Sequence, residues 1–101
     1  MDTATLIQEA RARFNHIAAK AQLKDKYDSK LIIADQGGLW KANLETITFL
    51  SAMSTDDIVL IDTFDNPVKV NRKELLDKLQ ALYTTVMEVY YEEWKTLEKS
   101  R

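Results

Sequence analysis

The sequence has 101 residues, of which 46% are hydrophobic and 30% charged, and it contains no cysteine. This length and composition fit one globular domain over residues 1–101. The lack of cysteine excludes disulfides, thiolate metal sites and thiol catalysis. The net charge of −2 is not the concentrated positive charge typical of DNA-binding domains. No apolar run approaches the roughly 20 residues that span a bilayer, and the N-terminus does not resemble a signal peptide. We therefore expect a soluble domain with no membrane partner.

Residues 5–26 have the periodicity of a helix. Thr5 and Gln8 fit a capping box at the start of this helix. A helix start nearer Asp2 or Thr3 is the alternative. Its apolar stripe consists of Leu6, Ile7, Ala10, Phe14, Ile17, Ala18 and Ala21. The stripe is narrow and rich in alanine, which predicts that a neighbouring helix packs closely against it.

The middle of the chain predicts two short hairpins and a short helix. Residues 31–34 and 39–42 have the composition of strands around Gly37 and Gly38, two glycines that we expect to supply the positive φ of a turn. Asn43 is expected to cap a helix that ends near residue 53. Residues 58–61 and 68–70 then predict a second hairpin around the turn formers at 65–67.

The most strongly patterned segment is residues 72–100, which predicts a long amphipathic C-terminal helix capped by Asn71, with Glu74 three residues on. Such a helix is nearly 40 Å long at about 1.5 Å per residue, whereas a compact chain of this size is only about 26 Å across. We therefore expect the helix to protrude. The predicted fold class is α+β, with long N- and C-terminal helices, two short β-hairpins forming a small antiparallel sheet, and a short middle helix.

No set of residues predicts catalysis, a metal site or a cofactor. His16 is the only histidine, and we interpret it as a surface or half-buried structural residue. The densest carboxylates are Asp56, Asp57, Asp62 and Asp65, and turn formation is the preferred explanation for the last two. The sequence therefore predicts a protein that is not an enzyme.

The C-terminal helix carries a cluster of large aromatic and apolar residues. Large aromatics are enriched where partners bind, because they offer much contact area with few rotatable bonds. Core packing is the alternative explanation, and it is preferred for Tyr83 and Tyr90. The predicted partner-binding residues are Met87, Tyr90, Tyr91, Trp94 and Leu97.

Residues 30–97 resemble small, mostly uncharacterised proteins of tailed bacteriophages, some encoded near structural genes. The resemblance is carried by the runs Gly37-Gly38-Leu39-Trp40-Lys41-Ala42, Ile58-Val59-Leu60-Ile61-Asp62 and Asp65 through Leu76, followed by a helix rich in Tyr, Trp and Glu. It implies a virion or assembly component found in the cytoplasm of an infected bacterium and in the virion. The resemblance includes no catalytic or metal motif, so it assigns no site residue.

The favoured hypothesis is a non-enzymatic protein-interaction module, a bacteriophage structural or virion-assembly accessory that binds copies of itself or a larger virion protein. An alternative is a small phage regulator that binds and inhibits a host enzyme or defence protein. A third is a weak nucleic-acid accessory, although we do not expect nucleic acid as a partner. Its cations would be Arg11, Arg13, Lys20, Lys24, Lys26 and Lys30.

Overall fold

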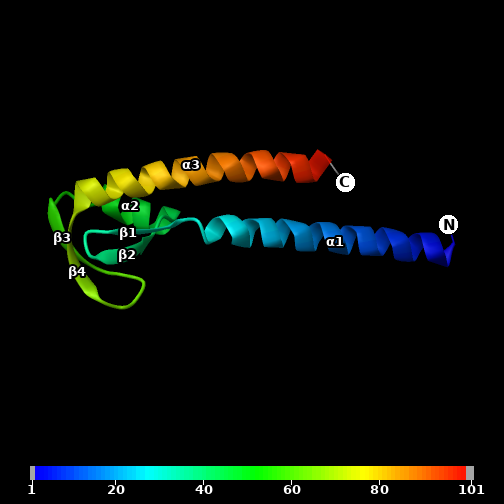
Figure 1. Cartoon of the computed structure of the whole chain (residues 1–101), viewed down its shortest axis with the longest axis horizontal. Coiled ribbons are helices and arrows are strands. Elements are labelled where there is room, and N and C mark those ends of the chain that lie inside the picture. Colours follow the sequence, from blue (N-terminus) through cyan, green and yellow to red (C-terminus); the bar gives the residue numbers. More distant parts are fainter. Residues whose placement is uncertain (1, 100–101) are drawn as a thin grey trace.

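A computed structural model describes residues 2–99 as three helices and two β-hairpins (Figure 1). In chain order these are α1 (Thr3–Asp28), β1 (Ile32–Asp35), β2 (Gly38–Lys41), α2 (Leu44–Ala52), β3 (Asp57–Ile61), β4 (Pro67–Asn71) and α3 (Arg72–Lys99). The predicted α+β class, with two long terminal helices and a short middle one, is confirmed. The two hairpins form separate two-stranded antiparallel sheets. The predicted C-terminal helix end at residue 100 lies outside the described residues.

Each helix begins at a side chain that accepts a hydrogen bond from an otherwise unpaired backbone amide. Asp2 Oδ1 accepts from the Thr5 amide at 2.8 Å, so the N-cap of α1 is Asp2, the earliest of the three candidate positions. The predicted caps Asn43 and Asn71 are confirmed, because they accept from the amides of Thr46 at 2.8 Å and Glu74 at 3.0 Å.

The turn between β1 and β2 is confirmed, but only one of its glycines has the predicted role. Gln36 and Gly37 form the two-residue turn, with φ of 50° and 83°, as a type I′ turn requires. Gly38 does not have positive φ, so the prediction for it was wrong. It is instead needed because the Trp40 ring lies over it, and an added Cβ would stand 2.5 Å from Trp40 Cζ2.

The hydrophobic core lies at one end of the molecule, in a region that we call the head (residues 29–82). Its buried residues are Leu31, Trp40, Ala42, Leu50, Val70, Leu75 and Leu79. Polar links also join its parts. Gln36 donates to the Asn71 carbonyl and accepts from the Asn71 amide, which ties the first hairpin to β4. Arg72 donates to the carbonyls of Leu50 and Thr55, which ties α2 to the start of α3.

The rest of the chain is an arm, which we define as α1 with residues 83–99 of α3. The two helices lie side by side and antiparallel, and α1 runs on beyond the end of α3 (Figure 1). Glu98, one residue before the end of α3, contacts His16 at 3.1 Å and Lys20 at 3.3 Å. About the first half of α1 therefore extends past α3. The molecule is accordingly elongated, 65 × 25 × 21 Å.

The side of α1 that packs against α3 is not the predicted apolar stripe. The contacts with α3 come from His16, Leu23 and Tyr27, which one helical face brings together. On the predicted stripe, Leu6, Ile7, Phe14 and Ile17 are exposed. Helical periodicity places that stripe on roughly the opposite side of α1. Within the described chain, α3 therefore packs against the face of α1 that lies away from the predicted stripe.

Candidate partner-binding surface

The structure divides the five predicted partner-binding residues between two environments. Tyr90 packs against Tyr27 of α1, with ring centroids 5.4 Å apart, and belongs to the periphery of the core. Leu97 lines a hollow between the two arm helices, beside Ala19 and Leu23. These two residues therefore take part in joining α3 to α1.

Tyr91 and Trp94 form a pair on a more open part of α3. Their rings are stacked, with centroids 6.0 Å apart and planes at 16°. Tyr91 is 53% exposed and Trp94 is half-buried. Lys95 places its ammonium 5.0 Å from the centre of the Tyr91 ring, a cation–π contact. The two rings are thus already stacked in the free protein, so a ligand that bound over them would not have to order them.

Beside this pair lies a groove of about 300 Å³ that α3 forms with the end of α1 and the start of α2. Its apolar lining consists of Tyr27, Leu31, Leu44, Tyr83, Met87 and Tyr90. A second hollow on α3 is lined by Tyr83, Met87 and Tyr91, so the groove and the aromatic pair share one side of the helix. We call this surface the α3 flank: Leu44, Tyr83, Met87, Tyr91 and Trp94, together with Tyr90, which packs against Tyr27 and also lines the groove.

A charged cluster fixes the two helices at the level of the α3 flank. Glu93 accepts hydrogen bonds from the Tyr27 hydroxyl and from Lys26, the latter at 2.8 Å. The bond from Lys26, and then that from Tyr27, hold the pKa of Glu93 below its usual range. The same carboxylate raises the pKa of Lys26 and of Tyr27. All three groups therefore keep their usual charge states at neutral pH, and the cluster serves as a clamp.

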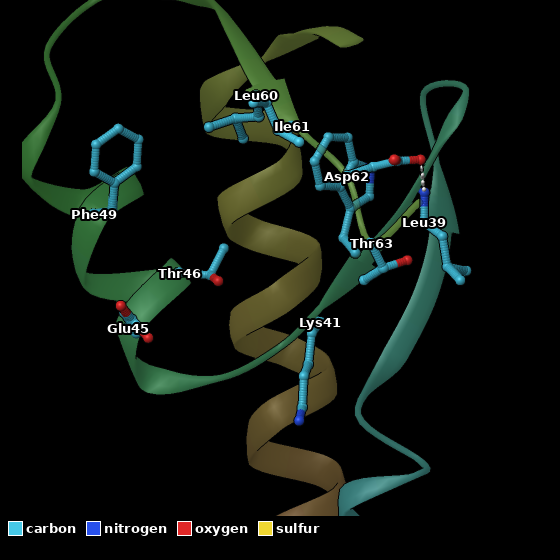
Figure 2. Close-up of a pocket in the computed structure, with 10 residues that line it drawn as sticks. Leu39, Lys41, Glu45, Thr46, Phe49, Leu60, Ile61, Asp62 and Thr63 are labelled. Carbon is cyan, nitrogen blue, oxygen red and sulfur yellow. Dashed lines mark hydrogen bonds between the residues drawn. The ribbon is translucent and has the colours of Figure 1, made fainter. Parts of the chain in front are cut away.

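A different hollow, of about 360 Å³, lies in the head between β2, α2 and the end of β3. Figure 2 shows Phe49, Thr46 and Glu45 on α2, across from Leu60, Ile61 and Asp62. Asp62 is buried, and its carboxylate accepts from the amides of Leu39, Phe64 and Asn66 at 2.9–3.2 Å. The bond from the Asn66 amide, and then those from Leu39 and Phe64, lower the pKa of Asp62. Its oxygens are occupied by the turn and by the first hairpin, which is a structural role.

The other residues considered for chemistry are dispersed. His16 is half-buried and contacts Glu98. Among residues 2–99, no group of three or more His, Asp or Glu side chains is arranged to hold a metal ion. Asp56, Asp57 and Asp65 are exposed.

Comparison with models of known protein families, with curated protein sequences and with solved structures finds no match. In the described part of the chain, no helix combines the length and the apolar character needed to cross a membrane.

The sequence did not point to the groove, because its walls come from segments far apart along the chain. Leu44 directly follows an N-cap and is exposed, and no local pattern places it opposite Tyr83. Tyr27 lies six residues beyond the last residue of the expected stripe, Ala21, which is less than two helical turns. The position of the groove depends on the packing of α1 against α3.

Proposed function

We propose that this protein is a non-enzymatic interaction module, a bacteriophage virion or assembly accessory, and that its α3 flank binds a larger virion protein. The observation that carries the proposal is the continuity of the flank, in which the stacked Tyr91–Trp94 pair adjoins an apolar groove lined by Tyr83 and Met87. Aromatic anchors beside a pocket are typical of binding hot spots. The bacteriophage assignment rests on the resemblance of residues 30–97.

The remainder of the flank also suits a partner surface. Leu44 is exposed and lines the groove, and the exposed charged residues Lys24 and Asp28 line it as well. An apolar centre with a polar rim is the usual anatomy of an interface. The clamp of Lys26, Tyr27 and Glu93 holds the two walls of the groove at a fixed spacing, so binding would require little reorganisation.

The nucleic-acid alternative draws less support from the charges of the arm. Two of its six cations, Lys20 and Lys26, form ion pairs with Glu98 and Glu93. Cations that are already paired contribute less to phosphate binding, because the neighbouring carboxylate repels phosphate.

The test combines location with binding. Mass spectrometry of purified virions and of assembly intermediates should detect the protein, and cross-linking should join α3 to a larger virion protein. Trp94→Ala should weaken that association roughly thirtyfold, as expected for loss of an aromatic anchor. The matched control is Phe64→Ala, which removes an exposed aromatic residue from the head and should leave association unchanged.

Two results would contradict the proposal. One is absence of the protein from virions and from every assembly intermediate together with tight binding to a host enzyme, which would favour the regulator. The other is equal association of wild type, Trp94→Ala and Phe64→Ala, which would remove the α3 flank from the interface.

A further inference from the structure

The outward side of α1 is an uncovered apolar stripe with regular spacing. Phe14 is 71% and Ile17 66% exposed, and Leu6 and Ile7 are exposed as well. Ile7, Ala10, Phe14, Ile17 and Ala21 are separated by alternating steps of three and four residues. This is the spacing of a coiled-coil seam, which forms when a second helix packs along it.

The side of α1 that faces α3 changes character where α3 ends. Ala19 and Leu23 lie against α3, whereas Thr5 and Glu9, two heptads earlier on the same side, are polar and exposed. The outward stripe has no such change and stays apolar from Leu6 to Ala21. The helix that would cover it must therefore approach from the side away from α3.

The exposed surface area of the chain is large enough to accommodate a partner helix of substantial size. Residues of this chain expose 7269 Å², whereas a compact monomer of its mass would expose about 5,900 Å². The excess of about 1,400 Å² is spread over the whole elongated chain, and it is larger than the roughly 800 Å² that each partner contributes to a standard interface.

The stripe is complementary to itself when one copy is reversed. Positions 7, 10, 14 and 17 are symmetric about residue 12, so a two-fold axis there sets Ile7 against Ile17 of a second copy and Ala10 against Phe14, while Ala21 falls opposite Thr3. No layer then combines two phenylalanines or two alanines, so the large Phe14 ring always packs against a small residue, which favours close packing. A parallel pair would instead set Phe on Phe and Ala on Ala, which separates the helices at one layer and leaves a gap at the next.

We propose that α1 pairs antiparallel with α1 of a second copy through this stripe, which gives a closed two-fold dimer. The surface is distinct from the α3 flank, which remains open on both copies. Arg11 and Arg13 flank the stripe and lie near their own counterparts across the axis. Their repulsion is screened within about 8 Å at physiological ionic strength, so added salt should tighten the dimer.

Two substitutions that add the same charge to α1 test the pairing. Phe14→Lys lies in the stripe, and Asn15→Lys lies beside it on an exposed position. Wild type and Asn15→Lys should sediment as dimers at micromolar concentrations, whereas Phe14→Lys should raise the dissociation constant at least roughly thirtyfold. Circular dichroism should show equal helix content in the two variants, which separates loss of pairing from loss of folding. A monomeric wild type, or equal dimerisation of both variants, would overturn the proposal.

Cysteine cross-linking tests the direction of pairing, and the chain contains no cysteine that could interfere. The antiparallel register sets residue 3 against residue 21 of the other copy. A mixture of Thr3→Cys and Ala21→Cys should therefore oxidise to the mixed disulfide. Disulfides within each variant alone would show parallel pairing and overturn the antiparallel arrangement. Sedimentation and cross-linking of the protein alone involve no virion partner. The dimer proposal can therefore fail while the proposed function stands.

Discussion

The head and the arm cover their apolar side chains very differently. In the head, Leu50, Leu75, Leu79 and Val70 are almost completely buried by elements that meet from several directions. Among the described residues of the arm, only Tyr27 and Val86 are buried. The head therefore contains a core of its own, whereas the arm consists of two helices that cover each other on one side.

This contrast indicates which region depends on association. Most of the stability of a protein helix comes from tertiary packing of its apolar face. The first half of α1 has no such packing among the described residues, although Leu6, Ile7 and Phe14 are exposed and available for it. The arm is therefore the region whose stability should respond to a second copy, and the head the region whose stability should not.

The largest expected difference between the head and the arm is in the free energy of unfolding that is lost when one apolar side chain is truncated in each region. Leu79→Ala should lower the free energy of unfolding by about 2–5 kcal/mol, because it leaves a cavity in the core. Phe14→Ala should change it by less than about 0.5 kcal/mol in the monomer, as expected for an exposed site. Urea denaturation at a protein concentration that favours the monomer measures both. Equal losses would contradict the division into head and arm.

A smaller effect on stability is expected from substitution of Asp62, whose carboxylate joins the two hairpins. Its pKa is lower in the folded protein than the roughly 3.9 of an unfolded Asp. Its stabilising contribution is therefore present above about pH 4 and is lost as the pH falls through the folded-state pKa. Asp62→Asn should lower the melting temperature at pH 7 by roughly 5 °C and should flatten the dependence of that temperature on pH between 5 and 3.

The control for Asp62 is Asp65→Asn, which changes an exposed carboxylate in the same turn. Asp65 has a φ of 62°, a conformation that Asn also accepts. This variant should keep the wild-type melting temperature and its pH dependence. A melting temperature of Asp62→Asn that matched the control at every pH would show that the three amide bonds contribute nothing measurable.

The local elements could be predicted from the sequence because their signals are local. Asn43 and Asn71 each lie directly before an apolar periodic segment, and both cap helices. Gly37 supplies a positive φ in the predicted turn. Gly38 was misassigned because the reason for it, the Trp40 ring, is a tertiary contact.

The packing of α1 could not be predicted in the same way. Its most regular apolar stripe is turned outward, while the side that meets α3 mixes His16 and Leu23 with Tyr27 and ion-pairing lysines. Periodicity identifies an apolar face but not the molecule that covers it. The same packing explains why the predicted partner-binding residues lie in two environments. Tyr90 contacts α1 because the side of α1 that meets α3 carries Tyr27.

Hydrogen exchange of α1 as a function of protein concentration tests the central claim most directly. We predict that the amides of residues 7–21 become more protected as the concentration rises through the dimer dissociation constant. Amides around Leu75 and Leu79 in the head should remain equally protected throughout. The exchange in Phe14→Lys should not depend on concentration. Protection of α1 that stays constant across the same range in the wild type would contradict the account.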